Sequence, residues 1–309
     1  MFKLKLTEFL RNPFKHFSII DWTNLVFLIF IWVIFLFTFN KTPYRITLLF
    51  FYSGMFVYLS AFAFIRANNY LGKWGRLVQF MNPVIFFFTM FESFFMLLPF
   101  FNTNRYDALL DKIDIAILSV SPTIWIEQFA VPWLTETFYL FYVFYFPMPI
   151  IILGWMYKRK MFKEIEQSIL VLFLCYYGGY ISYFFIPAEG PRFFLQEAYA
   201  GPLDGLFLTD PIRQIIDIFE PNKLDVFPSL HAGILAVTMF ISFKYNSRMF
   251  NWFIIPAIGI SISLIYCRYH YFIDIIAGFA LAALCAWLGP LIHDKLHSRF
   301  VHHFGEDEA

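Results

Sequence analysis

The chain has 309 residues, of which 60% are hydrophobic and only 15% are charged. A water-soluble domain of this size cannot bury so much apolar surface, so lipid is the expected solvent. The formal net charge of +1 gives no bulk electrostatic attraction to nucleic acid. The three cysteines, Cys175, Cys267 and Cys285, lie in apolar stretches and indicate no disulfide framework. These features predict an integral membrane protein without a nucleic-acid partner.

Apolar stretches that approach the length of a membrane span recur along the whole chain. A helix needs roughly 20 mostly apolar residues to cross about 30 Å of hydrocarbon. Eight stretches come close to this length, near residues 23–39, 46–64, 83–101, 135–157, 167–186, 228–243, 251–267 and 271–292. Their apolar residues are continuous rather than alternating, which favours helices over a β-barrel. We therefore predict an all-α fold, a polytopic transmembrane helical bundle of about eight spans.

Positive charge is distributed unequally between the connections. Lys and Arg are concentrated near both ends of the chain and around residues 66–76, 158–163 and 244–248. Because cytoplasmic loops are enriched in Lys and Arg, we predict cytoplasmic termini. The loops 102–134 and 187–227 and the turn 268–271 then face the extracytoplasmic side, which is periplasmic or lumenal.

The loop 102–134 contains a pattern typical of an amphipathic helix. Asp107, Asp111 and Asp114 are spaced to share one polar face, and leucines and isoleucines occupy the other positions. This pattern predicts an interfacial helix that lies on the membrane. The alternative is a solvated loop with acidic helix caps.

Three clusters of polar residues fall on the predicted outer side, at 187–192, 227–231 and 268–274. In the last cluster, Asp274 opens an otherwise apolar helix, and a carboxylate at membrane depth is costly and usually functional. His270 lies four residues earlier, so the two side chains share a face if the turn between them is already helical. Asp274 can then accept a hydrogen bond from one ring nitrogen of His270, which leaves the other nitrogen as a nucleophile. The alternative is that Asp274 only caps its helix.

The cluster at 227–231 places His231 in the first turn of a span that begins after Pro228. The free N–H groups and the positive dipole end of a helix start favour phosphate binding there. Arg192 and Arg268 supply two cations on the same side, and arginine pairs well with phosphate oxygens. Taken one at a time, these residues have ordinary interfacial roles, such as snorkelling. Their occurrence together on one membrane side favours a phosphate-handling site.

The same motifs resemble those of a known family. FPSLHAG at 227–233 and CRYHYFIDIIAG at 267–278, with PAEGPR at 187–192 and RYDALLDKID at 105–114, resemble the type 2 phosphatidic acid phosphatase superfamily. The match is closest to its inositol phosphorylceramide synthase branch. The resemblance covers about 83–293 and implies three parts. These are an N-terminal segment with two additional transmembrane helices (1–82), a six-helix phosphatase or phosphotransferase core (83–293) and a cytoplasmic tail (294–309).

Departures from the phosphatase branch point toward the transferase-like branch. The phosphatases usually carry a Lys seven residues before the Arg of the first motif, where this chain has Phe185 before Arg192. They also carry Gly where this chain has Leu230, and an Arg six residues before the second His. Here Arg268 lies two residues before His270.

The resemblance implies a two-step transfer of a phosphate-containing headgroup from a phospholipid. His270 attacks phosphorus and forms a phosphohistidine, Asp274 orients His270, and His231 serves as acid and then base. The implied phosphate-binding groups are Arg192, Arg268 and the backbone N–H groups around Ser229 and Leu230. No cofactor is expected, and the outer loops hold no His/Cys cluster with metal-ligand spacing. A lipid hydroxyl as acceptor makes the protein a transferase, and water as acceptor makes it a lipid phosphatase.

Other classes of function remain as alternatives at this point. Glu92, within an apolar stretch, is the one feature that favours a transporter. A non-catalytic lipid-binding protein has little use for both His231 and the His270–Asp274 pair. An intramembrane serine protease is disfavoured, because no GxSx pattern lies in a span.

Overall fold

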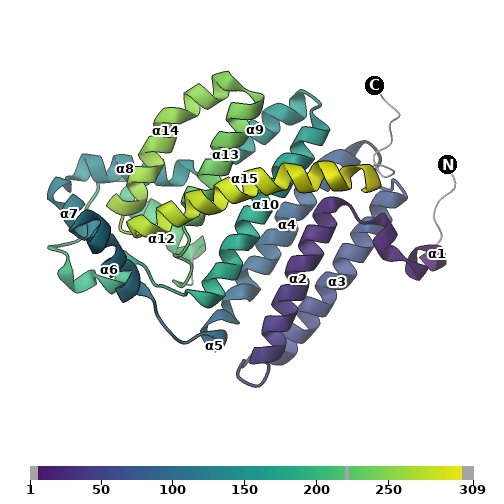
Figure 1. The fold of residues 1–309 in the computed structure, drawn as a ribbon, viewed down its shortest axis with the longest axis horizontal. Helices are drawn as coiled ribbons and strands as arrows, with labels where there is room; N and C mark the ends of the chain where they lie inside the picture. The colour runs from purple at the N-terminus through teal and green to yellow at the C-terminus, as the bar shows by residue number, and fades with distance from the viewer. Residues whose placement is uncertain (1–5, 220–222, 301–309) are drawn as a thin grey trace. The chain divides into compact units, whose positions relative to one another are not determined.

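The computed structural model describes residues 6–219 and 223–300, without the side chains at positions 73, 92, 95, 219 and 297–300. The side chain of Glu92 therefore lies outside the described part of the chain. Every regular element within that part is a helix, which confirms the predicted all-α class (Figure 1).

Five of the described helices are long and apolar enough to cross a membrane: α2 (Ile19–Thr38), α3 (Arg45–Ala67), α10 (Phe162–Phe185), α14 (Ser247–Tyr266) and α15 (Phe272–Phe300). A sixth span arises if α8 (Pro132–Phe144) and α9 (Pro147–Lys158), bent by 40° at their junction, are taken as one. The protein is thus an integral multi-pass membrane protein.

Two of the eight predicted spans do not meet the same criterion. One is α13 (Leu230–Tyr245), whose 16 residues extend about 24 Å at 1.5 Å per residue, less than the hydrocarbon thickness of about 30 Å. The other is α4 (Gly75–Phe95), which includes Arg76, Asn82 and Pro83. The structure therefore supports five or six spans where the sequence predicted about eight.

The chain divides into two compact units. The first comprises residues 1–101 and 288–309, and its described elements are α1 (Leu6–Arg11), η1 (Pro13–His16), α2, α3, η2 (Gly72–Trp74), α4, α5 (Leu98–Phe101) and the end of α15. In this unit α2 and α3 pack as an antiparallel hairpin (Figure 1). Arg66 pairs with the buried Asp21 at 2.6 Å, and Asp21 also forms a capping box with Ser18 at the start of α2.

The second unit comprises residues 102–287. Its elements before α13 are α6 (Asp107–Leu118), α7 (Pro122–Trp125), η3 (Ile126–Phe129), α8, α9, α10, α11 (Pro191–Phe194), η4 (Gln196–Ala198) and α12 (Thr209–Phe219). Helix α13 packs directly against three helices, α9, α10 and α14, and α14 also packs against α8. This division assigns the stretch 83–101 to the N-terminal unit, whereas the resemblance had grouped it with the six-helix core.

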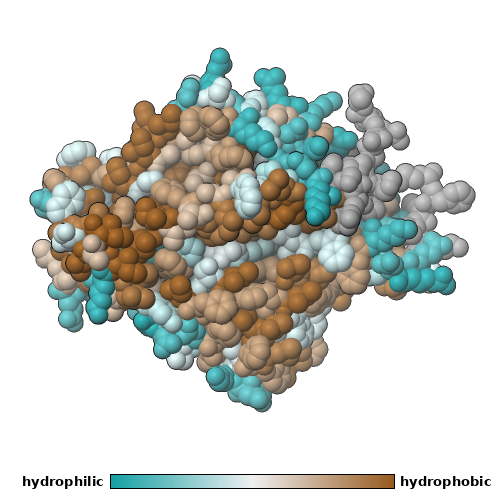
Figure 2. Space-filling model, in the orientation of Figure 1, coloured by the Kyte–Doolittle hydropathy of each residue, from teal (hydrophilic) through white to brown (hydrophobic). Residues whose placement is uncertain are grey.

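Helix α6 differs from its predicted orientation. Asp107 and Asp114 are buried, whereas Leu109, Ile115 and Ile117 are exposed. Figure 2 shows hydrophobic side chains gathered over α6. The polar face of this helix is therefore turned toward the protein rather than toward solvent, because backbone N–H groups of neighbouring segments bind its carboxylates. An apolar outer face remains compatible with the predicted contact with lipid.

Candidate active site

Two histidines from different motifs meet in the second unit. Nε2 of His270, in the turn between α14 and α15, lies 3.4 Å from Nδ1 of His231, in the first turn of α13. His270 is 4% exposed, so its ring is almost completely removed from water. Burial, followed by the proximity of His231, lowers the pKa of His270 well below its usual value. The His270 imidazole is therefore neutral at pH 7 and carries a lone pair on one ring nitrogen.

Asp274 lies beside the same histidine. Its Oδ2 atom is 3.6 Å from Nδ1 of His270, somewhat longer than the hydrogen bond expected from the sequence. The same oxygen accepts a hydrogen bond of 2.8 Å from the backbone N–H of Tyr271. At a separation of 3.6 Å, Nδ1 of His270 is turned toward Asp274, which is completely buried, without a hydrogen bond between them. Nε2 of His270 faces His231 instead.

The start of α13 is built by Ser229. Its hydroxyl accepts a hydrogen bond from the N–H of Ala232 and so caps the helix. Its own backbone N–H donates to the carbonyl oxygen of Asp274 at 2.9 Å. The Ser229 N–H is thus occupied by a hydrogen bond to α15, whereas the sequence predicted that it would face a phosphate. Leu230 supplies the first amide of the helix proper, and amides in this position have no partner within the helix.

A small pocket surrounds the two histidines. Its cavity of about 40 Å³ is lined by Tyr142, Glu189, Arg192, Phe193, Lys223, Asp225, Val226, His231, Tyr269 and His270. Tyr142 and Tyr145 pack on the ring of His231 with centroids 4.7 Å away in each case. These aromatic rings limit the access of water to the histidines.

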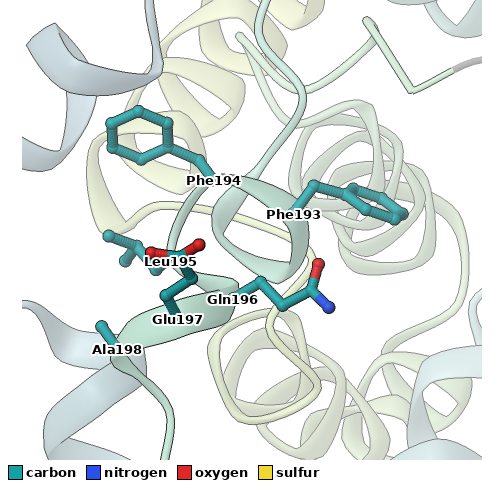
Figure 3. Close-up of a pocket in the computed structure, with 6 residues that line it drawn as sticks. All are labelled: Phe193, Phe194, Leu195, Gln196, Glu197 and Ala198. Carbon is teal, nitrogen blue, oxygen red and sulfur yellow. The ribbon is translucent and has the colours of Figure 1, made fainter.

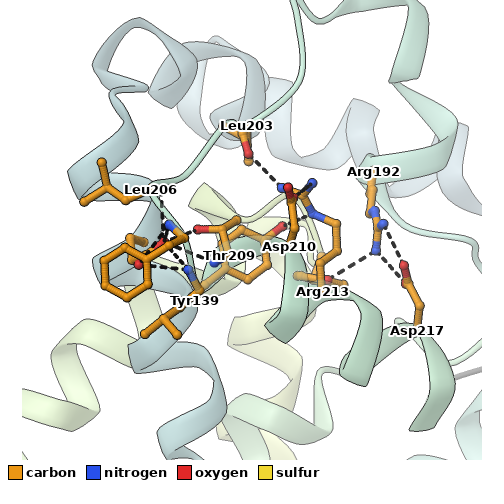
Figure 4. A network of polar contacts seen from close by, with 12 residues as sticks. Tyr139, Arg192, Leu203, Leu206, Thr209, Asp210, Arg213 and Asp217 are labelled. Carbon is orange, nitrogen blue, oxygen red and sulfur yellow. Dashed lines mark hydrogen bonds and ion pairs between the residues drawn. The ribbon is translucent and has the colours of Figure 1, made fainter.

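Two cations line the pocket, and both bind the same carboxylate. Arg192 forms two hydrogen bonds with Asp217 of α12, at 2.8 and 3.1 Å (Figure 4). Lys223 also reaches Asp217, at 3.0 Å. Burial acts to raise the pKa of Asp217, but these hydrogen bonds hold it below its usual value. An anionic group that enters the pocket therefore competes with Asp217 for Arg192 and Lys223.

The predicted phosphate ligand Arg268 lies elsewhere. Its guanidinium pairs with Glu127 at 2.8 Å, donates to the carbonyl oxygen of Gly201 at 2.9 Å and stacks on the Tyr199 ring at 3.7 Å. Arg268 is not among the residues that line the histidine pocket. This side chain ties η3 to the loop around 199–201, so its position differs from the one expected from the sequence.

Glu136, Lys223 and Asp217 are residues of the site region that the sequence analysis did not single out. Glu136 in α8 is buried and accepts hydrogen bonds from the backbone N–H groups of residues 206–209, at the start of α12. It thereby holds the helix that carries Asp217. A carboxylate within a predicted span was the available signal, and the same signal identified Asp274.

A second hollow, of about 530 Å³, adjoins the first. It is lined by residues 193–198, of which Phe193 also lines the histidine pocket (Figure 3). Among the described residues, no group of three or more His, Cys, Asp or Glu side chains is arranged to hold a metal ion.

The fold and the pocket define a multi-pass helical membrane protein in which two histidines and a carboxylate meet beside two cations. A family model described as the PAP2 superfamily matches residues 116–288, and the chain belongs to this superfamily. The match confirms the resemblance inferred from the FPSLH and RYHYFID motifs.

Two curated relatives show similarity to this chain. A PA-phosphatase related-family protein of Dictyostelium discoideum is 25% identical over 189 residues, which are 55% of this chain and 34% of the relative. The phosphoinositol dihydroceramide synthase of Bacteroides thetaiotaomicron is 28% identical over 165 residues, 48% of this chain and 53% of the relative. The chain thus spans about a third and about half of the lengths of these relatives. No solved structure matches with significance.

Proposed function

We propose that the protein is a lipid phosphotransferase that moves a phosphate-containing headgroup from a phospholipid donor to a lipid hydroxyl through a phosphohistidine. The observation that carries this proposal is the pair of ring nitrogens 3.4 Å apart, one on His231 and one on His270, in a pocket closed by aromatic side chains. The similarity to a protein named phosphoinositol dihydroceramide synthase supports a transferase.

In the first step, Nε2 of His270 attacks the phosphorus of the donor. An N–P bond forms, the P–O bond to the diacylglycerol oxygen breaks, and His231 gives a proton to that oxygen. Burial lowers the pKa of the His231 ring to about 4, so His231 gains this proton only when the negative charge of the bound donor favours the protonated ring. Asp274, 3.6 Å from Nδ1 of His270, stabilises the positive charge that develops on the ring. The low pKa of His270 favours this role, because a neutral ring is the nucleophile.

In the second step, a hydroxyl of the acceptor lipid attacks the phosphohistidine. His231, now neutral, takes the hydroxyl proton as the new P–O bond forms and the N–P bond breaks. Both histidines then return to their starting protonation states. Arg192, Lys223 and the first amides of α13 hold the phosphate oxygens. The phosphate thereby takes over part of the hydrogen bonding that Arg192 and Lys223 otherwise give to Asp217.

Water as the acceptor would make the same site a lipid phosphatase, the second candidate. The relative named for phosphatidic acid phosphatases supports it. Burial of His270 and the aromatic packing of Tyr142 and Tyr145 on His231 favour the transferase. They restrict the entry of water and so slow the hydrolysis of a phosphohistidine.

A product analysis tests this proposal. Purified protein in mixed micelles is incubated with a panel of phospholipids, with and without ceramide or diacylglycerol, and the products are identified by mass spectrometry. A transferase yields a new phospholipid and diacylglycerol only when both donor and acceptor are present. Release of diacylglycerol without any acceptor dependence would establish the phosphatase instead, and inactivity with every donor would contradict both. His270→Ala is the control.

We also propose that the active site faces the extracytoplasmic side, because Lys and Arg favour the opposite connections. Asp204→Cys places a thiol on an exposed loop of the active-site side, and Arg159→Cys places one between α9 and α10. In intact cells, an impermeant maleimide should label the first variant, and the second only after permeabilisation. The reverse pattern would overturn this orientation. The native Cys175, Cys267 and Cys285 are buried.

A further inference from the structure

Two buried carboxylates on α6 hold the segments that carry the proposed catalytic residues. Asp107 and Asp114 are seven residues apart, so they project from one face of the helix two turns apart. They are 2% and 0% exposed. A carboxylate is expensive to bury unless donors satisfy its oxygens, so the partners of these two side chains indicate what the helix stabilises.

Asp107 joins two of the three motifs. Its Oδ1 atom accepts hydrogen bonds from the backbone N–H of Gly190 at 2.8 Å, from that of Glu189 at 3.0 Å and from the Tyr271 hydroxyl at 3.0 Å. Gly190 precedes the short helix that bears Arg192, and Tyr271 follows His270 directly. One carboxylate therefore fixes the loop of the pocket arginine against the turn of the proposed nucleophile.

Asp114 holds the first turn of α15. Its two oxygens accept hydrogen bonds from the N–H groups of Phe272 at 2.7 Å and of Ile273 at 2.8 Å. The preceding N–H, of Tyr271, binds Asp274. Successive donors at this helix start are thus bound by carboxylates rather than open to a phosphate. The helix start of α13, which carries His231, is therefore the one suited to an anion.

We infer that α6 is a brace for catalysis, in which Asp114 sets the position of Asp274 relative to His270, and Asp107 sets the Arg192 loop relative to the same turn. This inference rests on the proposed function. Asp107 and Asp114 are positioning residues, because they act through the backbone of neighbouring segments and do not line the histidine pocket. A displacement of about 1 Å in such a site costs about 100-fold in rate.

The two carboxylates have separable effects. Asp114→Asn replaces one acceptor oxygen by an amide NH₂ that faces an N–H donor, so the start of α15 shifts while the Arg192 loop stays bound to Asp107. The turnover number kcat should fall about 10- to 100-fold, with the donor KM within about twofold. Asp107→Asn loosens the Arg192 loop as well, so kcat should fall and the donor KM should rise.

Tyr271→Phe and a double-mutant cycle with Asp107→Asn give a second, milder test. Tyr271→Phe removes only the hydroxyl that donates to Asp107, so it should lower kcat less than Asp107→Asn does. The double variant should lose less than the product of the two single losses, because the residues share one contact. Asp111→Asn is the matched control, since it makes the same chemical change on the same helix and should keep kcat within about twofold.

The experiment measures kcat, KM and the rate of phosphohistidine formation of the full-length protein in detergent. Each rate is normalised to the amount of monodisperse protein. The experiment also measures the carbethoxylation of His270 by diethyl pyrocarbonate, followed by mass spectrometry. If Asp114→Asn and Asp107→Asn keep the kcat of the wild type and only lower the unfolding temperature, α6 has a stabilising role alone and the inference is wrong. If the wild type turns over no donor, the proposed function fails. The brace is then decided by carbethoxylation alone, which should change in Asp114→Asn and not in Asp111→Asn.

Discussion

The carbonyl oxygen of Gly278 in α15 lies 3.3 Å from the point that a Cβ atom on Gly233 of α13 would occupy. A Cβ atom on Gly278 would in turn lie 2.3 Å from the carbonyl oxygen of Ser229. The two helices therefore approach backbone to backbone near their N-terminal ends, as the hydrogen bond from the Ser229 amide to Asp274 also shows. This close approach is what brings His231 and His270 together.

Gly278→Ala should separate the starts of α13 and α15. The added methyl meets backbone rather than a flexible side chain, so the helices must shift. We expect the loss of turnover to reach about 100-fold, since a shift of about 1 Å misaligns the two histidines. Gly154→Ala in α9 is the control, because a Cβ atom there meets nothing within 4 Å. Full activity of Gly278→Ala per folded protein would show that the contact is not needed.

The two histidines should respond differently to an activated donor. His270→Ala should abolish both turnover and covalent labelling by donor phosphate. His231→Ala should lower turnover of a phospholipid by about 10²- to 10⁴-fold, the usual effect of losing an acid–base catalyst. With a nitrophenyl phosphate ester, whose leaving group needs no proton, the loss in His231→Ala should be much smaller. Equal losses with both donors would contradict the acid–base role of His231. A phosphoenzyme in His270→Ala would contradict the role of His270 as the nucleophile.

Arg268 and Arg192 should differ in what they control. Arg268→Ala leaves the partly buried Glu127, whose side chain is 16% exposed, without its cation. Breaking a fully buried ion pair costs about 3–5 kcal/mol, so a smaller loss is expected here. The unfolding temperature in detergent should therefore fall, and the added change Glu127→Gln should restore part of it. Arg192→Ala removes a cation of the pocket and should mainly raise the donor KM. A normal unfolding temperature in Arg268→Ala with a raised KM would support the phosphate-binding role predicted from the sequence.

Asp225 should make donor binding depend on pH. Burial in the pocket raises the pKa of this carboxyl to about 7, although the positive charge of Lys223 acts to lower it. Glu189, Arg192 and the two histidines line the same pocket. Below this pKa the group is neutral, and above it the group adds a negative charge that repels an anionic donor. The donor KM should thus rise between about pH 6 and pH 8. Asp225→Asn should remove that rise, and identical KM profiles for the two proteins would contradict this assignment.

The sequence alone was sufficient for features that depend on local spacing or on composition. Apolar content decided the membrane class, because no water-soluble fold hides that much hydrophobic surface. The four-residue spacing of His270 and Asp274 predicted neighbouring side chains, and their atoms lie 3.6 Å apart, although His270 precedes α15 and is not helical. Ser229 was recognisable at a helix start, and the structure shows it as the cap of α13.

The number of spans was less predictable. The predicted stretch 228–243 was already short for a span, and α13 contains only 16 residues, since Ser229 caps it where the chain meets α15. Residues 135–157 were counted as one span, whereas the chain bends by 40° between α8 and α9. Both outcomes depend on the neighbours of a segment, and hydropathy does not report them.

Only the tertiary structure decided which charged side chains meet. Arg268 was expected at the phosphate, but its guanidinium binds Glu127, which is 141 residues away in the chain. The carboxylates of α6 were expected at a solvated face, and they bind backbone amides 82 to 159 residues away. Long side chains choose partners from all the groups that packing brings within reach, and a buried charge must find a donor or a counter-ion. Sequence spacing does not specify such choices, because the competing partners become neighbours only in the folded chain.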